Sequence, residues 1–161
     1  MIVSDAIHVE VSSEHLNINE AISFVSNDGY GAIDLFVGVV RNTHEGKDVT
    51  GISYDVHKPL AEKNMKEICD EAQSKWANTK YYVSHYHGSL DVGGVSVVIA
   101  VGAAHRGDVF EACRYVIEEI KKRTPVWKKE HYVAEESAWL PGQSLANQKK
   151  SESSCCGKCG G

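Results

Sequence analysis

Basic residues of three kinds recur in one segment of the chain, at spacings that could bring several positive charges to one ligand. In chain order they are His105 and Arg106, then Lys121, Lys122 and Arg123, then Lys128 and Lys129. Lysine, arginine and histidine bind phosphate and carboxylate groups, and they stabilise negative charge that develops during a reaction. The net charge of the whole chain is −5, so the basic segment is a local feature. We therefore expect a small anionic substrate rather than a nucleic acid.

His105 and Arg106 stand where an apolar segment ends and a helical pattern begins. The N-terminus of a helix carries unpaired N–H groups and attracts anions, so an arginine placed there is suited to holding one. The alternative is a surface arginine that pairs with Asp108 or Glu111. The spacing alone does not decide between the two interpretations.

Lys121, Lys122 and Arg123 close that helix, where basic residues also favour the helix dipole. Successive helical residues point about 100° apart, so the three side chains cannot share a face. Lys121 and Arg123 flank the apolar stripe on opposite sides, and spacing leaves both as candidates. Chemistry favours Lys121, because only a lysine readily loses its proton in a partly enclosed site.

Lys128 and Lys129 lie in a segment with the alternation of a strand, so only one of them can face a site. The alternative is an edge strand that lysines protect from aggregation. Arg41 ends a strongly apolar segment, where a charge favours a site at the edge of a sheet. The histidines show no spacing typical of zinc ligands, so no metal site is predicted.

The elements that must position these residues are predicted by the hydrophobic pattern to form an α+β domain, with two long helices and a short N-terminal one packed on a mixed or antiparallel sheet. Residues 32–40 are predicted to form a well-buried central strand, and residues 95–101 a central strand covered on both faces. Asn17 and Glu20 resemble a capping box that opens the short helix. Pro59 is predicted to start a long helix, and Pro125 to end the last one. Gly102 indicates a close approach of the backbone to another group.

Composition limits the remaining possibilities. Residues 1–142 have the length and apolar content of one domain, and residues 143–161 are predicted to be a flexible tail that contains cysteine and glycine. No apolar run is long enough to cross a membrane, and the N-terminus lacks the pattern of a signal peptide, so a cytoplasmic location is expected. The chain has five cysteines, an odd number, and a disulfide framework is not expected for a cytosolic domain.

Five segments together match a known family. They are FVGVVRN (36–42), PLAEKNM (59–65), GSLDVGG (88–94), AAHR (103–106) and IKKRTPVWKKE (120–130). On these residues the chain resembles the large, catalytic subunit of molybdopterin synthase. The resemblance implies an α/β hammerhead fold and a homodimer in which each subunit binds a small ubiquitin-like sulfur carrier by its Gly-Gly C-terminus, without a cofactor.

The resemblance also implies a reaction and a set of site residues. The enzyme would transfer sulfur from the thiocarboxylated carrier to cyclic pyranopterin monophosphate, forming molybdopterin. Lys121 and Lys128 would be the catalytic residues, with Lys121 acting either in acid–base catalysis or as a covalent amine. The substrate would be held by Arg41, His105 and Arg106. The alternative is a non-enzymatic scaffold or regulator that binds the carrier through the same surface.

Overall fold

The computed structural model describes residues 1–133, which form a large sheet, a small sheet and three helices. The helices are α1 (Ile18–Val25), α2 (Lys58–Lys75) and α3 (Arg106–Arg123). The strands are β1 (Ile2–Val3), β2 (Ile7–Ser12), β3 (Ala32–Val39), β4 (Thr43–His44), β5 (Lys47–Val56), β6 (Lys80–Tyr86), β7 (Gly88–Asp91), β8 (Val95–Ala103) and β9 (Val126–Tyr132). The predicted boundary between residues 142 and 143 lies outside the described residues.

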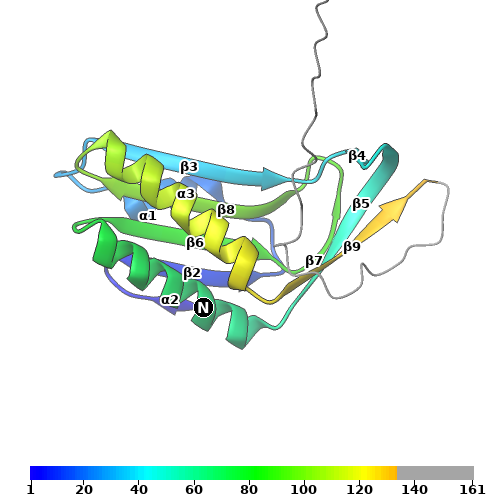
Figure 1. Ribbon diagram of the computed structural model, residues 1–161, viewed down its shortest axis with the longest axis horizontal. Coiled ribbons are helices and arrows are strands. Elements are labelled where there is room, and N and C mark those ends of the chain that lie inside the picture. Colours follow the sequence, from blue (N-terminus) through cyan, green and yellow to red (C-terminus); the bar gives the residue numbers. More distant parts are fainter. Residues whose placement is uncertain (134–161) are drawn as a thin grey trace, which may run out of the picture.

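The two sheets give the molecule its shape. The large sheet has the strand order β1-β2-β6-β8-β3, in which β2 and β6 are parallel and the other neighbours are antiparallel. The small sheet joins β4, β5 and β7, and β9 pairs with β5. Figure 1 shows the small sheet projecting from one end of the large one. This mixed α+β architecture confirms the predicted fold class.

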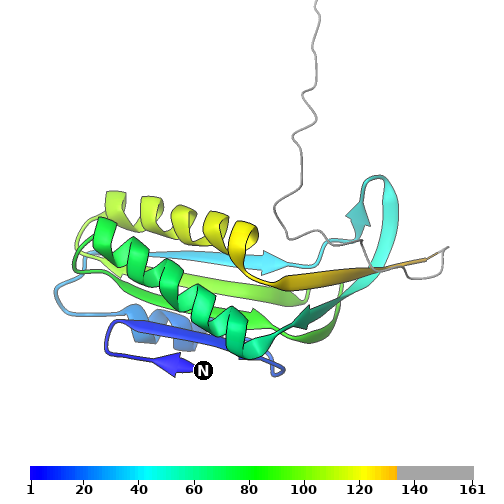
Figure 2. The same ribbon diagram turned by 60° about the horizontal axis from the view of Figure 1, so that its bottom comes forward.

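The helices cover both faces of the large sheet. α2 and α3 lie side by side on one face, and α1 packs on the other (Figure 2). The predicted helix starts are confirmed: the Asn17 side chain accepts hydrogen bonds from the backbone N–H groups of Asn19 and Glu20, and Pro59 lies in the first turn of α2. No helix among residues 1–133 has an apolar run that could span a bilayer.

The two strands expected to be central differ in their positions. β8 is buried along nearly its whole length, as predicted. β3 is instead an edge strand, with Ile33 and Val39 exposed at 40% and 53%. The prediction for residues 32–40 was therefore wrong in this respect. β3 contacts α3 and α1, but its outer edge has no strand partner among residues 1–133.

The close approach predicted at Gly102 is structural. A Cβ atom added there would lie 2.2 Å from the backbone oxygen of Val25, the last residue of α1. Only glycine lets α1 pack this closely on β8. The glycine therefore fixes the position of a helix and does not serve a ligand.

Candidate active site

Lys121 and Lys128 lie at the end of the large sheet from which the small sheet projects. Lys121 is in the last turn of α3 and is exposed. The chain then passes through Thr124 and Pro125 directly into β9, which carries Lys128. The short connection places both predicted catalytic lysines at the junction of α3 with the small sheet (Figure 1).

Arg123, the alternative to Lys121, is engaged elsewhere. Its two terminal guanidinium nitrogens donate to the two carboxylate oxygens of Glu71 on α2, at 2.7 and 2.9 Å. The hydrogen bonds from Arg123 and from Tyr115 lower the pKa of Glu71 to about 2. Lys122 pairs with Glu119 at 2.9 Å. Arg123 therefore links α3 to α2, and the assignment of Lys121 as the site residue stays a prediction.

Lys128 and Lys129 point to opposite faces of β9. Lys129 is paired in register with Ser53 on the face that also carries Trp127, which is 42% exposed. Lys128 lies on the other face with Glu130, whose side chain is buried. The Lys128 ammonium is 3.1 Å from Oε1 of Glu130, and the Lys128 side chain is 21% exposed. The geometry thus selects Lys128 for the enclosed face.

Glu130 is a buried carboxylate that the sequence analysis did not single out. Burial acts to raise its pKa, but the hydrogen bond from Tyr132 and the charge of Lys128 together lower it below the usual value. Lys128 is therefore paired with an ionised carboxylate. A glutamate two residues after a lysine on the same strand face was the available signal.

Arg41 lies in the short connection between β3 and β4, and it is exposed. In β4, which follows this connection, Nδ1 of His44 is 3.7 Å from Oε1 of Glu130. The hairpin of β4 and β5 therefore brings Arg41 to the same end of the molecule as Lys128. Arg41, Lys121 and Lys128 thus all lie toward the end of the large sheet that the small sheet projects from.

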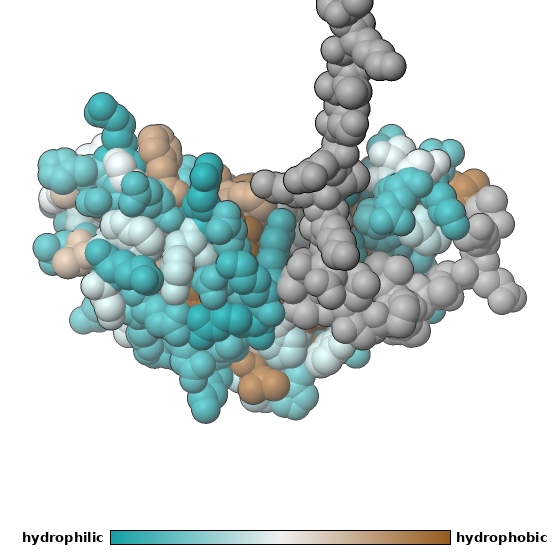
Figure 3. Space-filling model, viewed as in Figure 1, coloured by the Kyte–Doolittle hydropathy of each residue, from teal (hydrophilic) through white to brown (hydrophobic). Residues whose placement is uncertain are grey.

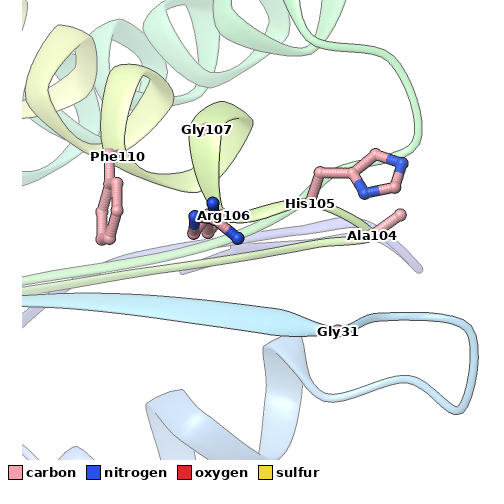
Figure 4. A pocket seen from close by; sticks show the side chains of 6 residues that line it. All are labelled: Gly31, Ala104, His105, Arg106, Gly107 and Phe110. Atoms are coloured by element: carbon pink, nitrogen blue, oxygen red, sulfur yellow. The ribbon is translucent and has the colours of Figure 1, made fainter.

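His105 and Arg106 lie at the opposite end of α3. Arg106 is the first residue of the helix and Lys121 is near its end, about 22 Å away along the axis from the rise per residue of an α-helix. Both residues line a hollow of about 530 Å³ with Gly31 and Phe110. Figure 4 shows Arg106 and Phe110 extending from α3 on the side of β3. One protomer therefore does not bring His105 and Arg106 to Lys121.

A second hollow, of about 540 Å³, continues along β3 and α3 and shares Phe110 with the first. Its lining includes Phe36, Cys113 and Ile117. Phe110 is 58% exposed. Figure 3 shows apolar surface where α3 and β3 run side by side. The two hollows form a groove, which we call the β3–α3 groove, that leads toward the last turn of α3.

Metal-binding side chains do not gather in the described part of the chain: residues 1–133 contain no group of three His, Cys, Asp or Glu residues placed to hold an ion. Cys69 and Cys113 are buried free thiols, and burial raises the pKa of both. They are core residues. The three cysteines after residue 150 lie outside the described residues.

Comparison with solved structures identifies the class of protein that this fold defines. The crystal structure of molybdopterin synthase from Staphylococcus aureus matches with a TM-score of 0.79 and 32% identity, covering 86% of this chain and 98% of that one. A complex of subunits 1 and 2 of molybdopterin-converting factor from Helicobacter pylori shares the fold with a TM-score of 0.67 and 19% identity, covering 84% of this chain and 92% of that one.

The sequence places the chain within this class. The model of the family described as MoaE protein matches residues 11–123, and the chain belongs to that family. It is 41% identical over 152 residues to a molybdopterin synthase catalytic subunit from Synechococcus elongatus, covering 94% of this chain and 92% of the relative. The predicted family is confirmed, as is the prediction that the chain belongs to an enzyme.

Proposed function

We propose that this chain transfers sulfur from a thiocarboxylated carrier protein to cyclic pyranopterin monophosphate, producing molybdopterin. The proposal is supported by the positions of Arg41, Lys121 and Lys128, which all lie toward the end of the large sheet that the small sheet projects from, and by the β3–α3 groove, whose lining reaches Ile117, one turn before Lys121. Cations at the end of a groove suit a reaction that brings a protein tail to a phosphorylated substrate. The cytoplasmic location expected from the sequence stays a prediction.

The carrier tail would lie in the β3–α3 groove. β3 is an edge strand, so its backbone can pair with an extended peptide, and Phe36, Phe110 and Ile117 offer apolar contact beside it. The groove runs along α3 toward Lys121. The Helicobacter pylori protein of the same fold is described as a complex of two subunits, which supports a small-subunit partner.

Two copies of the chain would complete each active site. His105 and Arg106 lie about 22 Å from Lys121 along α3, so they would hold the phosphate or pterin of the substrate in the site of a second protomer. The complete enzyme would then be a homodimer that carries two small subunits, a heterotetramer. Arg41 would bind the substrate within its own protomer.

The two lysines would have different roles. Lys121 is the predicted catalytic amine, in acid–base catalysis or covalently bonded to an intermediate. Lys128 is paired with ionised Glu130, so it suits the stabilisation of charge on the carrier's terminal carbonyl or on the substrate.

The test is single-turnover conversion of cyclic pyranopterin monophosphate with thiocarboxylated carrier. Lys121→Ala is expected to slow the reaction well over tenfold. This corresponds to an increase of more than about 1.4 kcal/mol in the activation free energy. Lys122→Ala is the matched control, because that side chain pairs with Glu119 one turn away on the same helix, and it should keep the wild-type rate. Carrier binding without product in the wild type would instead support the scaffold.

A further inference from the structure

We propose that Tyr132 and His44 are positioning residues for Lys128, acting through the buried carboxylate of Glu130. The inference rests on the proposed function only for its effect on turnover, since the arrangement itself is present in the folded chain. Lys128, Glu130 and Tyr132 alternate along β9, so their side chains share one face of the strand. His44 reaches the same carboxylate from β4.

The two oxygens of Glu130 have separate partners. Oε1 lies 3.1 Å from the Lys128 ammonium and 3.7 Å from Nδ1 of His44. Oε2 accepts a hydrogen bond from the hydroxyl of Tyr132. Because both oxygens are engaged, the carboxylate is fixed in rotation, and the oxygen that faces Lys128 stays in place.

Because Glu130 is buried, its contacts with Tyr132 and His44 matter more than they would at the surface. The Glu130 side chain is only 2% exposed, whereas that of Lys128 is 21% exposed. A buried carboxylate needs its partners, because water cannot replace them. The ammonium of Lys128 is thus held against a fixed anion, while about a fifth of the Lys128 side chain stays exposed. This geometry gives the site a cation in a defined position, as electrostatic catalysis requires.

The β4–β5 turn is anchored to the same group. Glu45 and Gly46 both have positive φ, as in a two-residue hairpin turn, and they hold His44 and Lys47 opposite each other. The Lys47 ammonium lies 5.5 Å from the ring centroid of Tyr132. The hairpin therefore contacts Glu130 directly through His44, and it contacts Tyr132 through Lys47. Since only Asn42 separates Arg41 from β4, these contacts also fix the start of the hairpin relative to Lys128.

The chain contains a matched arrangement that serves as a control. Tyr115 donates to Glu71 at 2.8 Å, and Glu71 also binds Arg123. This second set of tyrosine, glutamate and cation joins α2 to α3. Tyr115→Phe removes the same atom as Tyr132→Phe, but the residues that it contacts are not those we place in the site.

The experiment uses the full chain with its carrier and measures two quantities. The first is the single-turnover rate at saturating substrate. The second is acylation of Lys128 by an amine-directed reagent relative to the exposed Lys63, read by mass spectrometry without substrate. We expect Tyr132→Phe and His44→Ala to slow turnover roughly three- to tenfold, as for loss of one ordinary polar contact. Both should raise the relative acylation of Lys128.

A conservative replacement and the control define the outcome. His44→Asn, whose amide nitrogen can approach the position of Nδ1, should recover part of the rate lost in His44→Ala, and Tyr115→Phe should change neither quantity. The inference would be overturned if neither Tyr132→Phe nor His44→Ala changed the relative acylation of Lys128. Raised acylation in a protein whose wild type forms no product would support the inference while refuting the proposed function.

Discussion

At the scale of single residues, burial separates side chains with the same chemistry. His85 lies on the core face of β6, and burial lowers its pKa to about 4, although its hydrogen bond to the backbone oxygen of Tyr86 acts in the opposite direction. It stays neutral in the folded protein at pH values where a histidine in the unfolded chain takes up a proton. Glu130 is also buried, but the hydrogen bonds from Tyr132 and Lys128 lower its pKa below the usual value.

His85 should make the folded protein less stable in mild acid. Between the ordinary pKa of histidine and about 4, the unfolded chain binds a proton that the folded chain excludes, so stability falls as the pH falls through this window. Urea unfolding should show a loss of about 2 kcal/mol from this residue between pH 7 and pH 5. His85→Gln should remove that part of the pH dependence, whereas the exposed His15→Gln should retain it. Equal pH dependence in wild type and His85→Gln would contradict the assignment.

At the scale of elements, the packing of helices on the large sheet decides which ends meet. Gly102 lets α1 approach β8, and Arg123 joins α3 to α2 through Glu71. The Gly102 contact fixes the position of α1 on one face of the sheet. The Arg123–Glu71 contact fixes α3 beside α2 on the other face. α3 is thereby held so that its last turn reaches the small sheet while its first turn lines the hollow at Arg106.

Gly102→Ala should destabilise the fold. The added Cβ would clash with the backbone oxygen of Val25, and backbone cannot move aside as a flexible side chain can. We expect a loss of about 1–3 kcal/mol in the free energy of unfolding, measured by denaturant titration. Gly107→Ala is the control, because nothing lies within 4 Å of its added Cβ atom, and alanine favours a helix. Its stability should be unchanged or higher. If Gly102→Ala and wild type unfold at the same denaturant concentration, α1 can move away from the added Cβ atom without loss of stability.

At the scale of the whole molecule, the length of α3 determines how a complete site can form. Its two ends carry Arg106 and Lys121, which one chain keeps about 22 Å apart along the helix axis. A pair of protomers that places one end of α3 beside the opposite end of its partner's α3 would bring the two groups together. The proposed homodimer is therefore part of the proposed mechanism.

Mixed dimers should restore activity that each parent variant lacks. Lys121→Ala and Arg106→Ala are each expected to be nearly inactive alone. If the site combines both protomers, a mixed dimer has one site with both defects and one intact site. Equal mixing with free exchange of subunits should then give about a quarter of the wild-type rate, since half of the dimers are mixed. Activity no higher than the parents, with exchange verified by mass spectrometry, would place Arg106 outside the partner's site.

The sequence by itself determined the helices, the last strands and the family. Asn17, Pro59 and Pro125 predict helix boundaries because their effects on the backbone are local. The basic segment and its neighbouring motifs likewise identify the family without a fold. These features depend on residues close together in the chain, and the local sequence is enough to determine them.

Only the tertiary structure decided which candidates share a site. Apolar composition records that side chains are buried, but not whether a strand has two neighbours, so β3 was predicted to be central and proved to be an edge. Spacing could not show that Arg123 binds Glu71, because that glutamate lies on another helix. Nor could it show that Glu130 is buried beside Lys128 and His44. Each of these facts depends on contacts between segments far apart in the chain, and only the packed fold creates them.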